Sequence, residues 1–329
     1  MASKQKIIRE RYKIIEEIAR GGMGVVYLAT DLLTNSKVAL KTNSWSGEQN
    51  VQKAFETEAK LLARLENAGL PKVRDYFILD GNFQALVMDF VEGETLMELL
   101  ESGRYRVGCA LDAGLVVEWG IQVLEILCYL HRFTPPVIHR DIKPNNIKLK
   151  GDGTIVLLDF GLAKGTAVSV VSGASSYSSL EQLNLATTDA RSDIYALGAT
   201  LFHLLTNYYP LNALDRFQGF HGISSIVSGN SPDKTSLQAN PQKTVSEVNP
   251  RVPPEISEIV MKAMSLFPQD RFQTAEEMKT ALQTAKQAFG GSFAAFSDNK
   301  NGANTGFNNP GTFTALKSLL DEEEEILGA

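Results

Sequence analysis

The chain has 329 residues, of which 43% are hydrophobic and 21% are charged, proportions that are typical of a globular protein with a large core. The net charge is −6 and the sequence shows no basic stripe, so we expect no nucleic-acid binding. With two cysteines, no apolar leader and no uninterrupted apolar run of about 18 residues, the sequence predicts a cytoplasmic protein without a disulfide framework or a membrane span.

Residues 12–90 are predicted to form a small sheet with one helix. Alternating apolar and polar residues predict five antiparallel strands, over residues 12–19, 24–31, 37–43, 73–80 and 83–90. Apolar residues at helical spacing predict a helix over 51–65, in which Glu58 falls on the apolar face. Because a buried carboxylate is rare unless it is paired, we expect an ion pair between Glu58 and Lys41, which alternation places on the same strand face as Ala39.

A glycine-rich turn joins the first two strands. Gly21, Gly22 and Gly24 surround Met23, and glycines at such a turn let backbone N–H groups approach a phosphate. An ordinary hairpin turn has the same composition. The turn therefore predicts a nucleotide site only in combination with other motifs.

From residue 94 onward the pattern changes to helical spacing. It predicts helices over 115–131, 189–207 and 252–287, the last interrupted at 268–271. Residues 208–250 are rich in Ser, Asn, Pro and Gly, and predict a loosely ordered insertion around one short helix. Residues 289–313 predict a disordered linker, and residues 314–329 an acidic tail that could dock on a partner protein.

A loop and a hairpin carry the chemistry. Residues 137–146 read VIHRDIKPNN, in which Pro144 argues against a continuous helix. Strands over 147–150 and 154–158, joined by a turn at 151–153, predict a hairpin. Because a hairpin returns the chain to its starting end, Asn146 and Asp159 should lie side by side, and their oxygen atoms suit Mg²⁺. Asp141 would then lie close to whatever that ion holds.

These motifs together resemble the protein kinase family, and its bacterial serine/threonine branch in particular. HRDIKPNN at 139–146, DFG at 159–161, IARGGMGVV at 18–26 and VALK at 38–41 are similar to the family's catalytic loop, metal motif, glycine-rich loop and lysine strand. The resemblance implies a bilobal α+β fold over 12–288, with a small N-lobe (12–89) of five antiparallel strands and one helix, and a larger, mostly helical C-lobe (92–288). It implies transfer of the γ-phosphoryl group of ATP, with Mg²⁺, to Ser and Thr hydroxyls of proteins.

The resemblance also implies a role for each matching residue. Asp141 would accept the hydroxyl proton, Lys143 would neutralise charge on the moving phosphoryl group, and Asn146 and Asp159 would hold the metal. Roles in ATP binding are implied for Ile18, Gly21, Gly22, Gly24, Val26, Ala39, Lys41, Glu58, Met88, Asp89 and Val91. Structural or regulatory roles are implied for His139, Arg140, Phe160, Gly161, Glu181, Asp193 and Arg271.

Within this last group, the resemblance implies three contacts. Asp193 would anchor the catalytic loop, although a helix-capping carboxylate is an alternative, and Glu181 would pair with Arg271. Arg140 would bind a phosphate placed on the activation loop. The candidate acceptors of that phosphate are Thr166, Ser169, Ser172, Ser175 and Ser176.

Three positions depart from the family pattern. Ala19 stands at the first glycine of the glycine-rich loop, Ala174 at a threonine that touches the catalytic residues, and Leu180 at the proline of the APE motif. They leave two alternatives open. One is a pseudokinase, an interaction module that binds ATP without transfer, and the other is a kinase for one dedicated partner or for a small molecule.

Overall fold

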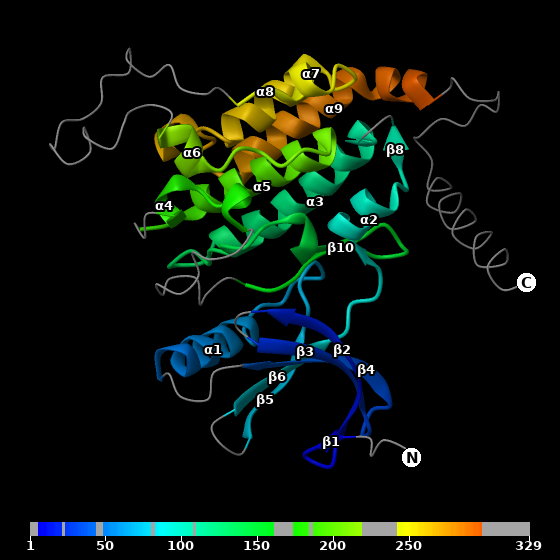
Figure 1. Ribbon diagram of the computed structural model, residues 1–329, viewed down its shortest axis with the longest axis vertical. Coiled ribbons are helices and arrows are strands. Elements are labelled where there is room, and N and C mark those ends of the chain that lie inside the picture. The colour runs from blue at the N-terminus through cyan, green and yellow to red at the C-terminus, as the bar shows by residue number, and fades with distance from the viewer. Residues whose placement is uncertain are drawn as a thin grey trace, which may run out of the picture. The chain divides into compact units, whose positions relative to one another are not determined.

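The computed structural model describes residues 6–21, 24–43, 49–79, 83–107, 110–160, 174–183, 187–218 and 242–297. The chain divides into two compact units, one formed by Met1–Glu92 with Val156–Ser172 and the other by Gly93–Ile155 with Gly173–Ala329. The first unit holds a large sheet and helix α1, and the second holds the remaining helices (Figure 1). The predicted α+β organisation, with a small sheet unit and a larger helical unit, is therefore confirmed.

In the first unit the described residues form a six-stranded antiparallel sheet with the order β1-β2-β3-β4-β6-β5. The strands are β1 (Ile7–Ile8), β2 (Tyr12–Gly21), β3 (Gly24–Asp31), β4 (Ser36–Asn43), β5 (Val73–Leu79) and β6 (Phe83–Asp89). Five of them were predicted. The sequence missed β1 because a strand of two residues carries no alternation signal.

One face of this sheet is closed by a hydrophobic cluster. Its buried members are Ile8, Tyr12, Ala29, Val38, Leu40, Phe77, Ala85 and Val87. Tyr12 stacks on Phe77 with ring centroids 5.7 Å apart, and its hydroxyl donates to Asp75 Oδ2 at 2.8 Å. Since Val38 and Leu40 point to this face, alternation turns Ala39 and Lys41 to the other face, where helix α1 (Gln49–Leu62) packs against β5 and β6.

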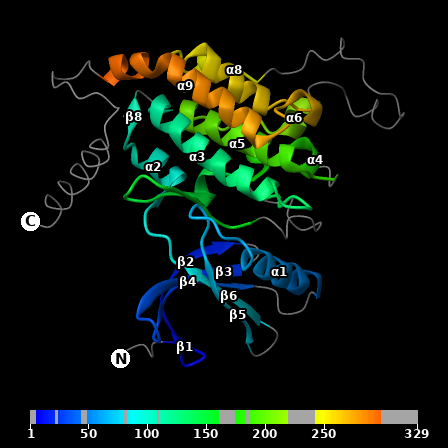
Figure 2. The same ribbon diagram turned by 180° about the vertical axis from the view of Figure 1, so that it is seen from behind.

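The second unit is built around helix α5, whose residues 192–206 are all buried. Its longer helices pack closely, with α5 against α3 and α8 and with α3 against α9 (Figure 2). The helices are α2 (Leu96–Ser102), α3 (Ala113–His131), α4 (Leu180–Leu183), α5 (Ala190–Thr206), α6 (Ala213–Gln218), α7 (Val245–Val248), α8 (Pro254–Ala263) and α9 (Ala275–Ser297). The long helices predicted over 115–131, 189–207 and 252–287 are confirmed, including the break near residue 268, where a short 3₁₀ turn (Pro268–Asp270) lies.

Short strands complete this part of the chain. Strand β7 (Glu94–Thr95) pairs with β10 (Ile147–Leu149), which is followed by β11 (Ile155–Leu157) in a sheet with the order β11-β10-β7. Strand β8 (Arg106–Val107) pairs with β9 (Ala110–Leu111). The hairpin predicted over 147–158 is therefore present, with both strands somewhat shorter than expected.

Two predictions at the C-terminal side need correction. Where one short helix was expected within 208–250, the described residues form two, α6 and α7. Helix α9 continues through residues 289–297, which the sequence assigned to the start of a disordered linker. Gly290 and Gly291 each disfavour a helix by about 1 kcal/mol relative to Ala, but the helix that precedes them carries the chain past them. The rest of the linker and the acidic tail lie outside the described residues, and partner docking by the tail stays a prediction.

Helix α3, predicted from the sequence over 115–131, is the one helix in the described ranges that is long and apolar enough to cross a membrane. Within the structure, 56% of its most apolar window is buried, and α3 packs against α5 and α9. The core helix of a globular unit has the same composition, so this one helix is weak evidence for a membrane span.

Candidate active site

The predicted irregular loop at 137–146 is present, and a buried carboxylate holds it. Asp193, at the start of α5, has a side chain with no exposed area. Its Oδ2 accepts the backbone N–H of His139 at 2.8 Å, and its Oδ1 accepts that of Arg140 at 2.8 Å. The ring Nε2 of His131, from the last turn of α3, lies 2.9 Å from Oδ2. Residues of helices α3 and α5 thus hold the backbone of the loop in place. These contacts are of the kind that the resemblance implies for Asp193.

Backbone strain in this loop shows why the anchor matters. Arg140 has a φ of 67°, a left-handed conformation that costs a residue with a Cβ about 1–2 kcal/mol. The bond from its N–H to Asp193 and a bond from Gln182 Nε2 to its carbonyl, at 3.0 Å, hold it there. Asp141 follows directly, so the strained residue sets where its carboxylate points.

Asp141, Lys143 and Asn146 form one cluster. Asp141 Oδ2 lies 3.1 Å from Lys143 Nζ and accepts a bond from Asn146 Nδ2 at 2.9 Å. Asn146 Nδ2 also donates to the backbone carbonyl of Asp141 at 2.8 Å, which leaves Asn146 Oδ1 as the atom able to ligate a cation. The Asp141 side chain is 14% exposed. A carboxylate that is held on one side and still reachable from solvent is suited to accept a proton from a hydroxyl.

In the first unit, the sheet register gathers four of the predicted ATP-binding residues on one face. Lys41 lies opposite Val26, and Ala39 lies opposite Met88, and directly opposed residues share a face. Lys41 Nζ lies 3.2 Å from Asp159 Oδ1. The lysine side chain is 12% exposed and the Asp159 side chain 42%, so this pair presents a cation and an accessible carboxylate together.

The glycine-rich turn brings two backbone segments into close approach. Gly21 and Gly24 face each other at the end of β2 and β3. A Cβ added to Gly24 would lie 1.8 Å from the carbonyl oxygen of Thr42 in β4, which explains why this position is glycine. Gly22 and Met23 lie outside the described residues, as do the loop atoms that would contact a phosphate.

The remaining ATP-site candidates lie in β2, at the end of β6 and just after β6. Ile18 is exposed, in a stretch of β2 with two register shifts. Asp89 lies opposite Val38, and its carboxylate bonds Arg74 Nε, so only its backbone could serve a ligand in the way the resemblance implies. Val91 follows β6 and is half-buried.

Several predicted contacts fall outside the described residues. The side chain of Glu58, in α1, is among them, so its ion pair with Lys41 stays a prediction. The same holds for Gly161 and for the loop candidates Thr166, Ser169 and Ser172, and for the side chains of Ser175 and Ala174. Asn146 and Asp159 belong to different units, and their meeting around a metal also stays a prediction. Phe160 is described and buried.

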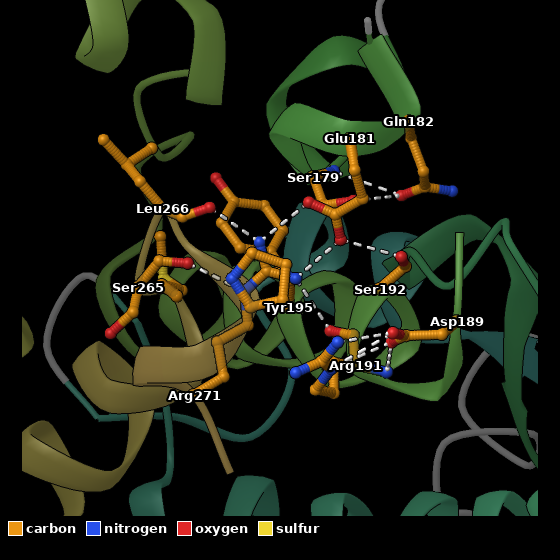
Figure 3. A network of polar contacts seen from close by, with 12 residues as sticks. Ser179, Glu181, Gln182, Asp189, Arg191, Ser192, Tyr195, Ser265, Leu266 and Arg271 are labelled. Carbon is orange, nitrogen blue, oxygen red and sulfur yellow. Dashed lines mark hydrogen bonds and ion pairs between the residues drawn. The ribbon is translucent and has the colours of Figure 1, made fainter. Parts of the chain in front are cut away.

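Glu181 and Arg271 form a buried ion pair (Figure 3). Arg271 Nη1 and Nη2 donate to Glu181 Oε1 and Oε2 at 2.7 and 3.0 Å. The other N–H groups donate to the backbone carbonyls of Ser265, Leu266 and Arg191 at 2.8, 2.8 and 3.0 Å. All five N–H donors of the guanidinium are therefore used, and the pair joins the start of α4 to the segment before α9.

The environment of the pair favours its charged form. Burial, the largest influence, would raise the pKa of Glu181, but the hydrogen bonds and charge of Arg271 and a bond from Ser192 Oγ at 2.8 Å outweigh it, and the pKa is lowered. Tyr195 lies under the guanidinium, with 4.9 Å between the Arg271 Cζ and the ring centroid. Leu180, at the position of the family's proline, is buried at the first turn of α4.

Sequence reasoning missed two polar contacts near this site. Gln182 Oε1 accepts from the backbone N–H and the hydroxyl of Ser179, both at 3.1 Å, while its Nε2 binds the catalytic loop. The Tyr177 hydroxyl and His203 Nδ1 share a hydrogen bond of 2.6 Å inside the unit. Burial lowers the pKa of His203 to about 4, so the imidazole is neutral at pH 7. A lone histidine in the apolar run of α5 was the one available signal.

Within the described residues, no group of three or more His, Cys, Asp or Glu side chains could hold a metal ion. A magnesium site of the expected kind uses one amide and one carboxylate oxygen, together with phosphate oxygens, and needs no such cluster. The oxygen donors of Asn146 and Asp159 fit a hard cation.

Comparison with known proteins gives concordant matches. The protein kinase domain model matches residues 12–283. Serine/threonine-protein kinase PknL of Mycobacterium tuberculosis is 34% identical over 286 residues, which cover 84% of this chain and 66% of PknL. Serine/threonine-protein kinase PrkC of Bacillus subtilis is 32% identical over 292 residues, covering 86% of this chain and 42% of PrkC. The chain thus spans about two fifths of the length of PrkC.

The structural match is of the same kind. The crystal structure of the PknI kinase domain of Mycobacterium tuberculosis superposes with a TM-score of 0.64 at 26% sequence identity, covering 86% of this chain and 99% of that domain. The likeness extends over both the sheet unit and the helical unit.

Proposed function

Since this chain belongs to the protein kinase family, we propose that it transfers the γ-phosphoryl group of ATP to Ser or Thr hydroxyls of proteins. The cluster of Asp141, Lys143 and Asn146 carries the proposal, because it places a proton acceptor, a cation and an amide oxygen on a loop that Asp193 holds rigid. The relatives at about 30% identity are serine/threonine protein kinases by name, which supports these hydroxyls over tyrosine.

In the proposed reaction, the substrate hydroxyl oxygen forms a bond to the γ-phosphorus while the bond from that phosphorus to the β–γ bridging oxygen breaks. The hydroxyl proton passes to Asp141 Oδ, and ADP leaves. Lys143 Nζ, 3.1 Å from Asp141, stabilises negative charge on the phosphoryl oxygens as it moves. Lys41 would bind the α and β phosphates, and it already lies 3.2 Å from Asp159.

Asn146 and Asp159 are the residues proposed to hold Mg²⁺. When bound, the ion neutralises charge on the phosphate oxygens. The side chains of Asn146 and Asp159 are themselves oriented by hydrogen bonds and an ion pair. Asn146 is fixed by two bonds to Asp141, and Asp159 is fixed by Lys41.

We also propose regulation by phosphorylation of the activation loop. Arg140 Nε is buried and has no hydrogen-bond partner among the described residues, and a buried guanidinium atom without a partner is costly. A phosphate on Thr166, Ser169, Ser172, Ser175 or Ser176 would supply one. Mass spectrometry after incubation with ATP and Mg²⁺ tests this, and a fully active wild type without loop phosphate would refute it.

The transfer itself is tested with Asp141→Asn. Loss of the proton acceptor should lower the rate about 10²- to 10⁴-fold, while ATP binding, measured by calorimetry, stays within about twofold. Asp215→Asn, at an exposed aspartate of α6, is the matched control and should retain full activity. An Asp141→Asn protein with normal transfer would refute the role of this carboxylate.

The departures at Ala19, Ala174 and Leu180 leave the two alternatives open, and Ala174 in particular motivates the kinase for one dedicated partner or for a small molecule. Radiolabelled ATP offered with generic basic proteins separates them from the main proposal. Label on generic protein supports a general protein kinase, label on the chain alone supports one dedicated partner, and ATP binding without any label supports a pseudokinase. A small-molecule kinase would consume ATP only when its substrate is present.

A further inference from the structure

A glutamine on α3 clasps the turn of the β10–β11 hairpin. Gln122 Oε1 accepts the backbone N–H of Ile155 at 2.9 Å, and Gln122 Nε2 donates to the carbonyl of Gly153 at 3.2 Å. One side chain therefore satisfies a donor and an acceptor on the chain as it enters β11. Ile155 is 1% exposed, so without Gln122 its N–H would be buried without a partner.

Two backbone bonds also close this turn. Within the turn, Lys150 N–H donates to Thr154 O at 3.0 Å, and Gly153 N–H donates to Lys150 O at 2.9 Å. Each strand has three residues. A ribbon this short is marginal alone and depends on what it packs against. On its other edge, β10 pairs with β7 through Lys148 and Thr95.

Helix α3 is a rigid platform for such a clasp. The residues around Gln122 that face the interior, Ile121, Val123 and Leu124, are buried. The helix begins at a capped N-terminus, where Asp112 accepts the N–H of Leu115 at 3.0 Å. At its other end, His131 contacts the loop anchor Asp193. The same helix thus contacts both the anchor of the loop that precedes the hairpin and the turn within the hairpin.

We propose that Gln122 is a positioning residue for the candidate metal site, because it fixes to α3 the start of β11, the strand that leads to Asp159. Strand β10 begins at Ile147, directly after Asn146, and β11 ends two residues before Asp159. A slip of β11 by one residue relative to α3 would turn its side chains to the opposite face. The inference rests on the proposed function, since it concerns the magnesium ligands of that reaction.

Two variants and one control test the clasp. Gln122→Met keeps the length of the side chain and removes both bonds. Gln122→Glu keeps an acceptor for the Ile155 N–H and removes the donor to Gly153. Gln242→Met is the matched control, because Gln242 also accepts a backbone N–H, from Leu211 at 2.7 Å, and donates to a backbone carbonyl, of Lys243 at 3.2 Å.

The first measurement is hydrogen–deuterium exchange of the segment 147–157. We expect exchange at the hairpin amides to be about tenfold faster or more in Gln122→Met, since a lost hydrogen bond weakens local protection, and to be intermediate in Gln122→Glu. Gln242→Met should leave this segment unchanged. Unchanged exchange in Gln122→Met would overturn the clasp, and if that variant does not fold, Gln122→Glu gives the same test.

The second measurement is the Mg²⁺ concentration needed for half-maximal ATP binding, followed by calorimetry. Substitution of residues that orient metal ligands typically lowers metal affinity 10- to 100-fold. For this indirect contact we expect Gln122→Met to raise the required Mg²⁺ concentration about tenfold, while ATP binding at saturating Mg²⁺ stays nearly normal. Faster exchange with an unchanged Mg²⁺ requirement would reduce Gln122 to a structural role and overturn the proposal. A wild type that binds MgATP but transfers no phosphoryl group would refute the proposed function alone, because neither measurement uses turnover.

Discussion

Removing Arg271 should destabilise the helical unit severely. In Arg271→Met, Glu181 keeps its burial, with 12% of its side chain exposed, but loses both bonds to the guanidinium. Breaking a buried ion pair from one side costs about 3–5 kcal/mol. Three backbone carbonyls also lose a donor, each at about 1 kcal/mol. We therefore expect the free energy of unfolding to fall by at least about 3 kcal/mol at pH 7.

The assay is urea unfolding of the whole chain, followed by circular dichroism and tryptophan fluorescence, whose coincidence tests for a single transition. Arg191→Met is the matched control. Arg191 pairs with Asp189, whose side chain is 50% exposed, and an ion pair of this kind is worth about 1 kcal/mol or less. The reasoning is wrong if Arg271→Met loses no more than the control.

A double variant and a pH series sharpen the test. Arg271→Met with Glu181→Met removes both charges, and we expect it to be more stable than the sum of the two single variants predicts. In the wild type the pKa of Glu181 is lowered, so the unfolded state binds more protons as the pH falls below about 4.5, and the stabilisation is lost. In Arg271→Met the two lowering effects of Arg271 are gone and burial is opposed mainly by the bond from Ser192, so the pKa of Glu181 should rise and the difference between the two proteins should shrink at acidic pH.

Two further predictions concern packing and protonation. Burial lowers the pKa of His203 from 6.5 to about 4, so between these pH values the unfolded state binds more protons than the folded state. The free energy of unfolding should therefore fall by up to about 3 kcal/mol as the pH drops through that window. The melting temperature should change less between pH 7 and pH 5 in His203→Gln than in the wild type. Gly93 has a φ of 115°, and a Cβ there would lie 2.1 Å from the carbonyl oxygen of Leu149, so Gly93→Ala should lower the free energy of unfolding by well over 1 kcal/mol. A Cβ at Gly151 would meet nothing within 4 Å. Gly151→Ala should therefore leave the free energy of unfolding unchanged or raise it by up to about 1 kcal/mol. Equal thermal stability of these two alanine variants would contradict the steric argument.

The helices and strands that could be predicted are those in which apolar residues recur at regular spacing. Five strands and the long helices follow from alternation and helical spacing, because burial on one face requires those patterns. Strand β1 has two residues and no period, and the continuation of α9 past Gly290 depends on the helix that precedes it. Helices α6 and α7 are short for the same kind of signal.

For the candidate site, local motifs located the loop residues but not what holds them. Asp141, Lys143 and Asn146 are close in sequence, so their cluster could be expected from spacing. Gln122 reaches a turn some thirty residues away, and Tyr177 reaches His203 across the unit. Such pairs join segments that share no local pattern, and only the packing of the helices brings them together.

The anchoring of the loop at 137–146 also limits how the site could be transplanted. Its backbone shape, including the left-handed Arg140, depends on an acceptor from α5 and on a histidine from α3. If these ten residues alone were grafted into another scaffold, the side chains would be present but their arrangement would not be kept. The smallest portable piece is the loop together with both helices, which makes this chemistry a property of the helical core and not of a peptide motif.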